Sequence, residues 1–188
     1  WWVRLTDEPF PRLSVVKQVH AGDDAWMGPF GSRSSADEAV RALHEVVPLR
    51  QCLTRLSPRR QSTACVLAEM GRCVAPCTGS VDVDEYRAVV DDIVTVMAGD
   101  ASSVVEALTA RMAELAASER FEEAATVRDR TLALVRGASR AQRIAPLAER
   151  DVAGSGGIGR RLEKRGINDP GKGPVAILDE VEIHAEIT

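Results

Sequence analysis

Four cysteines are the residues whose type and spacing most clearly suggest chemistry. The chain has 188 residues, and its four cysteines, Cys52, Cys65, Cys73 and Cys77, all lie within one short segment. Thiolates are soft ligands, and four of them suit either Zn²⁺ or an iron–sulfur cluster. Structural disulfides in a secreted protein would instead tie distant segments together. The clustering predicts one shared metal or cluster site, and the spacing alone does not choose between zinc and iron–sulfur.

Basic residues lie next to these cysteines in the sequence. Arg50, Arg55 and Arg72 are the nearest of them. Positive charge favours the thiolate form of cysteine. We therefore expect these arginines to lower the thiol pKa values and to offset the charge of a site with four thiolates.

No other set of residues predicts catalysis. The histidines His20, His44 and His184 are far apart and match no metal or nucleophile motif, and no carboxylate pair stands out as an acid–base set. The glycines at 154–159 resemble a fragment of a dinucleotide-binding motif, but no strand precedes them. We interpret them as a linker and expect no catalytic residues in this chain.

The composition is typical of a soluble globular protein. Charged residues make up 28% and hydrophobic residues 45%, and the formal net charge is −4. These values argue against a uniformly basic nucleic-acid binder, and no apolar run is long enough for a membrane span. We expect a cytoplasmic protein without a membrane partner. The chain starts with Trp1 and not with Met, so we expect its native start to be missing.

The first third of the chain predicts a small β structure followed by a helix. Residues 12–19 are rich in β-branched side chains and are expected to form a hairpin with 25–27 around a turn at 20–24. A lone hairpin is marginal in water, so its sheet partners are expected before Trp1. A helix is predicted over 35–47, with a capping box formed by Ser35 and Glu38.

Three helical segments are predicted after the cysteines. Asp82 and Glu85 are candidate caps of the first, which ends at Gly99, and Ser103 and Glu106 are candidate caps of the second. The third follows a break at 118–120, with Gly137 as a candidate interruption. The side chains predicted to face inward are Tyr86, Val89, Val90, Ile93 and Met97, then Val105, Leu108, Met112 and Leu115, and then Phe121, Ala124, Ala125, Leu132 and Val135.

The helical pair at 103–136 is too short to build a sufficient core alone. Phe121 is a large apolar anchor followed by two small alanines, a pattern that lets another helix approach closely. The region 78–137 has 12 acidic and 6 basic residues, which favours a protein surface over DNA phosphate. The pair packs either on the rest of this chain, which the pattern alone favours, or on a partner.

The ordered set of segments resembles the UvrC family. The segments are EPFPRLSVV from residue 8, MGPFGSRSSADEAVRALHEVVPLRQC from residue 27, the cysteine stretch at 65–77, and SERFEEAATVRDR from residue 118. Each is weak alone, but their order is specific. The family provides the nuclease subunit of bacterial nucleotide excision repair.

The resemblance implies an α+β fold with five parts. Residues 1–51 would be the C-terminal part of a small GIY-YIG-type α/β nuclease domain, and 52–80 the segment with the cysteine ligands. A connecting helix at 81–100 and a UVR helical hairpin at 101–138 would follow. Residues 139–188 would hold a helix extension, the Gly-rich linker and an unassigned tail.

The resemblance also implies a cofactor. In this family four cysteines at similar spacing bind an iron–sulfur cluster, which favours [4Fe–4S] over zinc on Cys52, Cys65, Cys73 and Cys77. Mg²⁺ or Mn²⁺ would be needed only in the nuclease domains of the parent protein.

The implied partner is UvrB, whose own hairpin pairs with the UVR hairpin, while DNA is reached through the complete complex. The signature positions of this hairpin are matched by Phe121, Glu122, Ala124, Ala125, Arg128 and Asp129.

Two alternatives remain open at this point. The catalytic strands of the family's first nuclease domain would lie before Trp1, and its second nuclease domain would lie after residue 188. The chain is therefore also compatible with the UvrC-like half of an exonuclease fusion in DNA repair. A non-enzymatic, zinc-binding UVR regulator is the other alternative, although such regulators generally use CxxC pairs, which this chain lacks.

Overall fold

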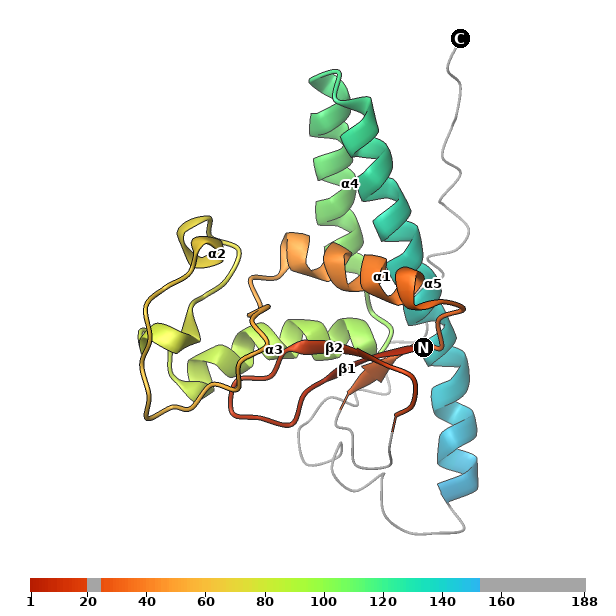
Figure 1. Ribbon diagram of the computed structural model, residues 1–188. Helices are drawn as coiled ribbons and strands as arrows, with labels where there is room; N and C mark the ends of the chain where they lie inside the picture. The colour runs from red at the N-terminus through yellow and green to blue at the C-terminus, as the bar shows by residue number, and fades with distance from the viewer. Residues whose placement is uncertain (20–24, 153–188) are drawn as a thin grey trace. The chain divides into compact units, whose positions relative to one another are not determined.

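The computed structural model describes residues 1–19 and 25–152. Residues up to Ala148 form one compact unit, and of the second unit, Glu149–Thr188, only the end of a long helix is described. The turn predicted at 20–24 and the linker and tail predicted at 154–188 lie outside the described residues. The described elements (Figure 1) are β1 (Trp2–Leu5), β2 (Leu13–Val16), β3 (Trp26–Met27), α1 (Arg33–Val46), α2 (Val66–Glu69), the short 3₁₀ helix η1 (Pro76–Thr78), α3 (Val83–Met97), α4 (Ser102–Ala117) and α5 (Phe121–Val152).

The sheet has the strand order β2-β1-β3, and both pairings are antiparallel. Val3 of β1 pairs with Val15 on one side and with Met27 on the other. The predicted direct pairing of β2 with β3 is therefore wrong, because β1 lies between them. Val3 and Leu5 point into the core and are buried, which suits a central strand. The sheet partner was expected before Trp1, but in the described residues it is β1, which begins at Trp2. With the helices that follow, the fold is α+β, as predicted.

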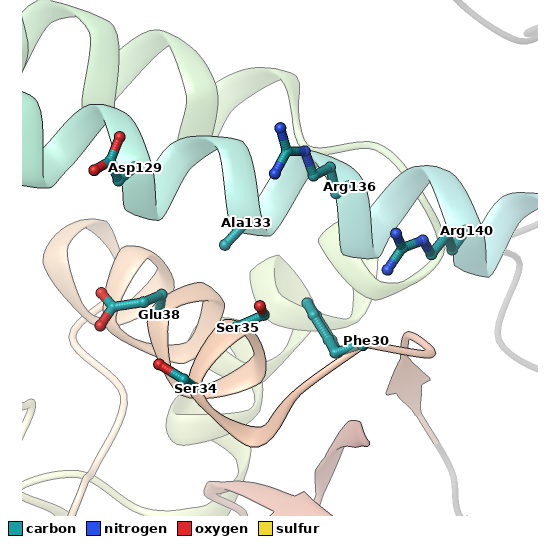
Figure 2. Close-up of a pocket in the computed structure, with 9 residues that line it drawn as sticks. Phe30, Ser34, Ser35, Glu38, Asp129, Ala133, Arg136 and Arg140 are labelled. Atoms are coloured by element: carbon teal, nitrogen blue, oxygen red, sulfur yellow. The ribbon is translucent and has the colours of Figure 1, made fainter.

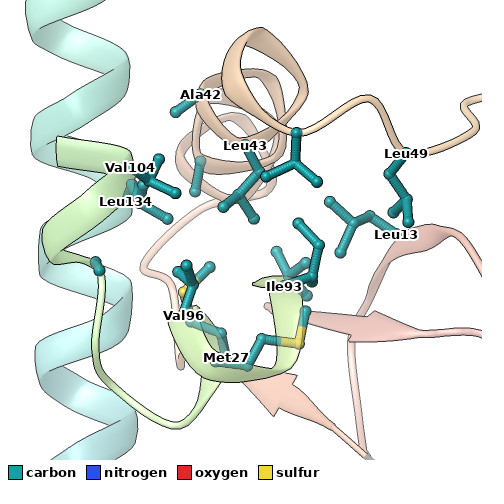
Figure 3. Packing of buried hydrophobic residues seen from close by; sticks show 14 of the residues in the cluster. Leu13, Met27, Ala42, Leu43, Leu49, Ile93, Val96, Val104 and Leu134 are labelled. Atoms are coloured by element: carbon teal, nitrogen blue, oxygen red, sulfur yellow. The ribbon is translucent and has the colours of Figure 1, made fainter. Parts of the chain in front are cut away.

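One hydrophobic core connects the sheet to the helices. Figure 3 shows side chains from β2, β3, α1, α3, α4 and α5 that meet in one place, namely Leu13, Met27, Leu43, Ile93, Val96, Val104 and Leu134, with Leu49 beside them. The core takes in residues from the predicted segments 1–51, 81–100 and 101–138, so these segments pack together.

Helix α1 begins at Arg33 and not at residue 35. Its N-cap is Ser32, whose hydroxyl accepts the Ser35 N–H at 3.1 Å, so the capping box predicted for Ser35 and Glu38 is wrong. The helix contacts β1 and β2 through a face of mostly small residues. The buried residues of that face are Ala36, Ala39, Ala42 and Leu43, and Val40 is partly buried.

Helix α3 begins as predicted, with Asp82 and Glu85 as a capping box. The Asp82 carboxylate accepts the N–H groups of Asp84 and Glu85 at 2.9 and 2.8 Å, and the Glu85 carboxylate accepts the Asp82 N–H at 2.9 Å. Val89 is only partly buried, and Val96 joins the buried face instead. The other predicted positions, Tyr86, Val90, Ile93 and Met97, are buried.

Helix α4 lacks the cap that the sequence predicts at Ser103 and Glu106. Its N-cap is Ala101, which has no side-chain cap, and the helix starts at Ser102. The Asp100 carboxylate accepts the N–H and the hydroxyl of Ser102 at 3.2 and 2.7 Å. Asp100, the residue before the N-cap, therefore binds the first N–H of α4 in place of the predicted cap.

The hairpin turn lies where the sequence predicts it, but the buried face of α5 differs from the predicted one. Glu119, between α4 and α5, has the positive φ of 59° that a tight reversal requires. Phe121, predicted to face inward, is 64% exposed, and Ala124 and Ala125 are only partly buried. The predicted stripe mixed two adjacent faces of the helix. The buried positions recur every three or four residues at Val127, Thr131, Leu134, Ala138 and Ala141.

Gly137 does not interrupt α5. The helix continues through it, and the Phe30 ring lies so close that a Cβ at this position would collide with it. Phe30 is itself buried. The glycine therefore serves close packing between α5 and the segment before α1.

Candidate metal site and partner-binding hairpin

The four cysteines lie on one long loop, residues 52–78, which we call the cysteine loop. Its only regular structure is α2 and η1. Cys52 and Cys65 are exposed and Cys73 and Cys77 are half-buried, and all four are free thiols. The structure therefore contains no disulfide among them, which leaves every sulfur available as a ligand.

Backbone hydrogen bonds hold the second half of the cysteine loop. The Val74 N–H donates to the Pro48 carbonyl at 3.0 Å, and the Ser62 N–H donates to the Cys77 carbonyl at 2.7 Å. Ala75 adopts the left-handed conformation before η1, and its N–H donates to the Cys73 sulfur at 3.4 Å. This turn brings Cys73 and Cys77 to the same end of the loop.

The surroundings of the Cys73 thiol shift its pKa. Burial raises the pKa of the Cys73 thiol, the Ala75 N–H opposes this shift, and the charges of Cys52, Cys65 and Cys77 add to it. The expectation that basic neighbours lower the thiol pKa is therefore wrong for Cys73. Within the described residues, no three Cys, His, Asp or Glu side chains lie close enough together to hold a metal ion as they stand.

A buried network that the sequence analysis did not identify supports the start of the cysteine loop. The Arg50 side chain is fully buried, and its Nη2 lies 2.6 Å from the Glu8 carboxylate in an ion pair rather than a hydrogen bond. The backbone N–H of Arg50 donates to the Tyr86 hydroxyl at 3.1 Å, and that hydroxyl donates to the Pro11 carbonyl at 2.8 Å. Burial raises the pKa of Tyr86, so the hydroxyl stays protonated and keeps this bond. The network links the β1–β2 connection, α3 and the loop.

The hairpin of α4 and α5 has a buried base and an exposed tip. At the base, Val104, Leu108 and Leu134 are almost fully buried in the core. Arg130 of α5 forms ion pairs with Glu38 and Glu45 of α1. The interpretation as intrachain packing, which the pattern alone favoured, is therefore correct for the base.

The six predicted partner-binding residues lie in the first turns of α5. Phe121 and Glu122 belong to the hairpin tip, residues 116–126, where every side chain is exposed except the partly buried Ala124 and Ala125. Arg128 and Asp129 are exposed and pair with each other at 2.8 Å. The structure thus brings all six together on one exposed stretch of helix.

A cavity of about 280 Å³ lies between the start of α1 and α5 (Figure 2). Its two carboxylates are already engaged, because Glu38 pairs with Arg130 and Asp129 pairs with Arg128. Arg140 donates to the Pro29 carbonyl at 3.0 Å. The cavity is therefore a polar crevice between packed helices and does not add a set of reactive groups.

Two family models match successive parts of the chain. Residues 1–96 match the family model described as UvrC/Cho excinuclease, middle domain, and residues 102–135 match the UvrB/uvrC motif. The chain belongs to the UvrC family. The first match runs without a break across the predicted border between residues 51 and 52, and includes the sheet, the cysteine loop and most of α3.

Curated relatives carry the name UvrABC system protein C. The one from Nitratidesulfovibrio vulgaris is 34% identical over 138 residues, which are 73% of this chain and 20% of the relative. Those from Moorella thermoacetica and Thermus thermophilus are 37% and 34% identical, over 69% and 71% of this chain. The chain spans about a fifth of the length of these relatives. No solved structure matches the chain.

None of the helices in the described residues is both long enough and apolar enough to cross a membrane.

Proposed function

We propose that this chain is the part of a UvrC-like DNA incision complex that carries a metal cluster and docks UvrB, in bacterial nucleotide excision repair. One observation carries the proposal: residues matched to the UvrC middle domain are followed almost at once by residues matched to the UvrB/uvrC motif. In this proposal incision, with its Mg²⁺ or Mn²⁺, belongs to the nuclease domains of the parent protein. DNA is reached through the complete complex.

In the proposal the four cysteines hold a [4Fe–4S] cluster. The donor set suits this group in type and number, because four free thiols share one loop. The cysteine loop also lacks an apolar core, since Leu53, Val66 and Met70 are 62–79% exposed. A bound cluster would supply a covalent cross-link between the ends of the loop, as structural metal sites do in small domains.

The UvrB-docking part of the proposal rests on the hairpin tip. A short hairpin leaves its apolar residues exposed unless a partner covers them, and two such hairpins can close a four-helix core. Phe121 is large, aromatic and 64% exposed, and the neighbouring Ala124 and Ala125 allow a second helix to approach closely. The excess of acidic residues in 78–137 favours a protein over DNA as the direct partner.

Metal analysis of the full chain tests the cluster. We expect anaerobically purified protein to contain iron and sulfide and to absorb near ~400 nm, as thiolate-bound iron–sulfur centres do. Protein that contains zinc without iron would contradict the iron–sulfur cluster and would indicate a four-thiolate zinc site instead. A chain that binds neither metal would contradict this part of the proposal.

A binding titration tests the docking part. Fluorescently labelled full chain is titrated with UvrB, and duplex DNA serves as the control ligand. We expect saturable binding to UvrB and little binding to DNA. Tight binding of duplex DNA by this chain, or no binding of UvrB, would overturn the assignment of the hairpin.

A further inference from the structure

Arg50 is a buried cation, and one of its guanidinium nitrogens contacts both the carbonyl and the sulfur of Cys52. Its side chain is 0% exposed and lies just before the cysteine loop. One guanidinium nitrogen, Nη1, donates to the Cys52 carbonyl at 2.9 Å, to the Thr54 carbonyl at 2.8 Å and to the Cys52 sulfur at 3.3 Å. Nε donates to the Phe10 carbonyl at 2.6 Å. Both the backbone and the side chain of Cys52 are thus held by the same arginine.

Burying a cation is costly unless it is paired and its donors are satisfied. Glu8 supplies the opposite charge, with its carboxylate 2.6 Å from Nη2 and its side chain only 9% exposed. A role in packing alone would be met more simply by an apolar side chain, because buried ion pairs are weak contributors to stability. The direction of the donors toward Cys52 is what such a packing role does not explain.

We propose that Arg50 is a positioning residue of the four-cysteine site, fixing Cys52 and donating an N–H to its metal-bound sulfur. The inference rests on the proposed function, because it needs a metal or cluster on the cysteines. Groups that hydrogen-bond to metal ligands set ligand orientation and tune the metal, and their loss commonly weakens metal binding about 10–100-fold. Hydrogen bonds to the sulfurs also contribute to the reduction potential of iron–sulfur clusters.

Among the described residues, no charged side chain donates a hydrogen bond to the sulfur of Cys73 or Cys77. The Cys73 sulfur accepts the neutral backbone N–H of Ala75, and the Cys77 thiol lies 4.0 Å from the Thr63 carbonyl, to which it donates. In the described structure the charged contact is therefore specific to Cys52. Cys52 is exposed and does not lie in a helix or a tight turn. Its side chain therefore depends on a contact from another residue to hold its position.

The test uses the full chain loaded with NMR-active Cd²⁺, which binds four-thiolate sites and leaves the protein diamagnetic. A hydrogen bond to a metal-bound sulfur transmits scalar coupling from the N–H proton to the metal. With arginine selectively labelled with an NMR-active nitrogen isotope, we expect one arginine side-chain proton to couple to cadmium. The signal should vanish in Arg50→Lys and persist in Arg55→Lys, the matched control, since Arg55 is also near Cys52 in the sequence but is exposed, whereas Arg50 is buried.

A second readout follows the rate at which a chelator removes Cd²⁺ from the same proteins. We expect removal from Arg50→Lys at least about 10-fold faster than from wild type and from Arg55→Lys. If Arg50→Lys does not fold, the presence or absence of arginine–cadmium coupling in the wild-type protein tests the role of Arg50 alone. A purely structural arginine would give no coupling at all.

The outcomes separate this inference from the function on which it rests. Wild-type protein that binds Cd²⁺ without any arginine coupling overturns the role of Arg50 and leaves the four-thiolate site intact. Wild-type protein that binds neither Cd²⁺ nor iron overturns the metal site and the inference with it. Coupling from Arg50 together with faster metal loss in Arg50→Lys establishes the positioning role.

Discussion

In the core, Leu43 and Ile93 are completely buried by side chains of this same chain, whereas Leu53 in the cysteine loop is 79% exposed and Phe121 at the hairpin tip is 64% exposed. The core gains its stability from apolar burial inside one molecule. The cysteine loop and the hairpin tip have few apolar partners of their own. Under the proposed function their partners are a metal cluster and a second protein.

The comparison also shows where buried polar groups are used. Within the described residues, the fully buried arginine stands at the border between core and cysteine loop, with Glu8 and Tyr86 as its partners on the core side. A buried network of ion pairs and hydrogen bonds of this kind favours one arrangement of the segments that it joins. It therefore ties a loop without its own core to a rigid part of the molecule.

The largest expected effect comes from breaking the metal site. Cys73→Ser should lose the bound metal completely, because it replaces one of the four soft thiolate ligands with a hydroxyl. Trypsin should then cut the loop at Arg55, Arg59 or Arg60 as fast as it cuts chelator-treated wild type. Helix content, measured by circular dichroism, should stay nearly unchanged, because the loop adds only the partly buried Leu56 and Val74 to the core. A loop that resists trypsin equally with and without metal would contradict this prediction.

Acidification should destabilise the core through His44. Burial, followed by the charge of Arg72, lowers the pKa of His44 from 6.5 to about 4. Between these two pKa values the unfolded chain binds a proton that the folded chain does not, so stability falls as the pH drops from 6.5 toward 4. At 1.36 kcal/mol per pKa unit the loss is at most about 3 kcal/mol.

Urea unfolding across this pH range measures the effect. His44→Gln is the control, since it keeps His20 and His184 and removes only this titration. We expect a smaller loss of stability on acidification in the variant than in the wild type. Parallel pH curves for the two proteins would show that His44 is not responsible.

A substitution at the exposed hairpin tip should weaken partner binding without lowering the folding stability of the core. Phe121→Ala should weaken binding to UvrB at least about 30-fold, because an aromatic hot spot contributes ~2 kcal/mol or more and each 1.4 kcal/mol is tenfold. The folding stability of the free chain should change little, since Phe121 is 64% exposed. Met70→Ala is the matched control, because Met70 is 62% exposed but lies in the cysteine loop. Equal affinity of wild type and Phe121→Ala would restore a role for the hairpin in intrachain packing alone.

Only some features set by residues close in sequence could be predicted from the sequence, since the capping boxes predicted at Ser35 and Ser103 are wrong. The capping box at Asp82 and most of the buried face of α3 depend on neighbours within one or two turns, and these are confirmed. The place of the hairpin turn at 118–120 is confirmed for the same reason. The face of α5 is different, because its sequence carries two overlapping apolar stripes and only the packing partners, such as Phe30 at Gly137, decide between them.

Features set by distant residues could not be predicted in this way. The central place of β1 depends on the strands that pair with Val3 on its two sides. The sequence of residues 2–5 alone does not indicate which strands these are. Glu8, Arg50 and Tyr86 are separated by 42 and 36 positions, and each is ordinary in its own segment. The sequence indicated the cysteines as a group, but the arginine that holds one of them appears only when the chain is folded.

The smallest expected change in stability comes from removing a helix cap. It compares the cap at Asp82, which is present in the structure, with the cap predicted at Ser103, which is not. Asp82→Ala should lower stability by ~1 kcal/mol, because it leaves two N–H groups at the start of α3 without their acceptor. In a domain of this size that corresponds to about 2–4 °C in melting temperature. Ser103→Ala is the matched control at the start of α4, where the helix has no cap from this serine. Since the hydroxyl of Ser103 caps nothing, we expect a change within about 0.5 kcal/mol for this variant. Thermal unfolding followed by circular dichroism measures both, and equal losses in the two variants would mean that the capping box at Asp82 does not stabilise α3.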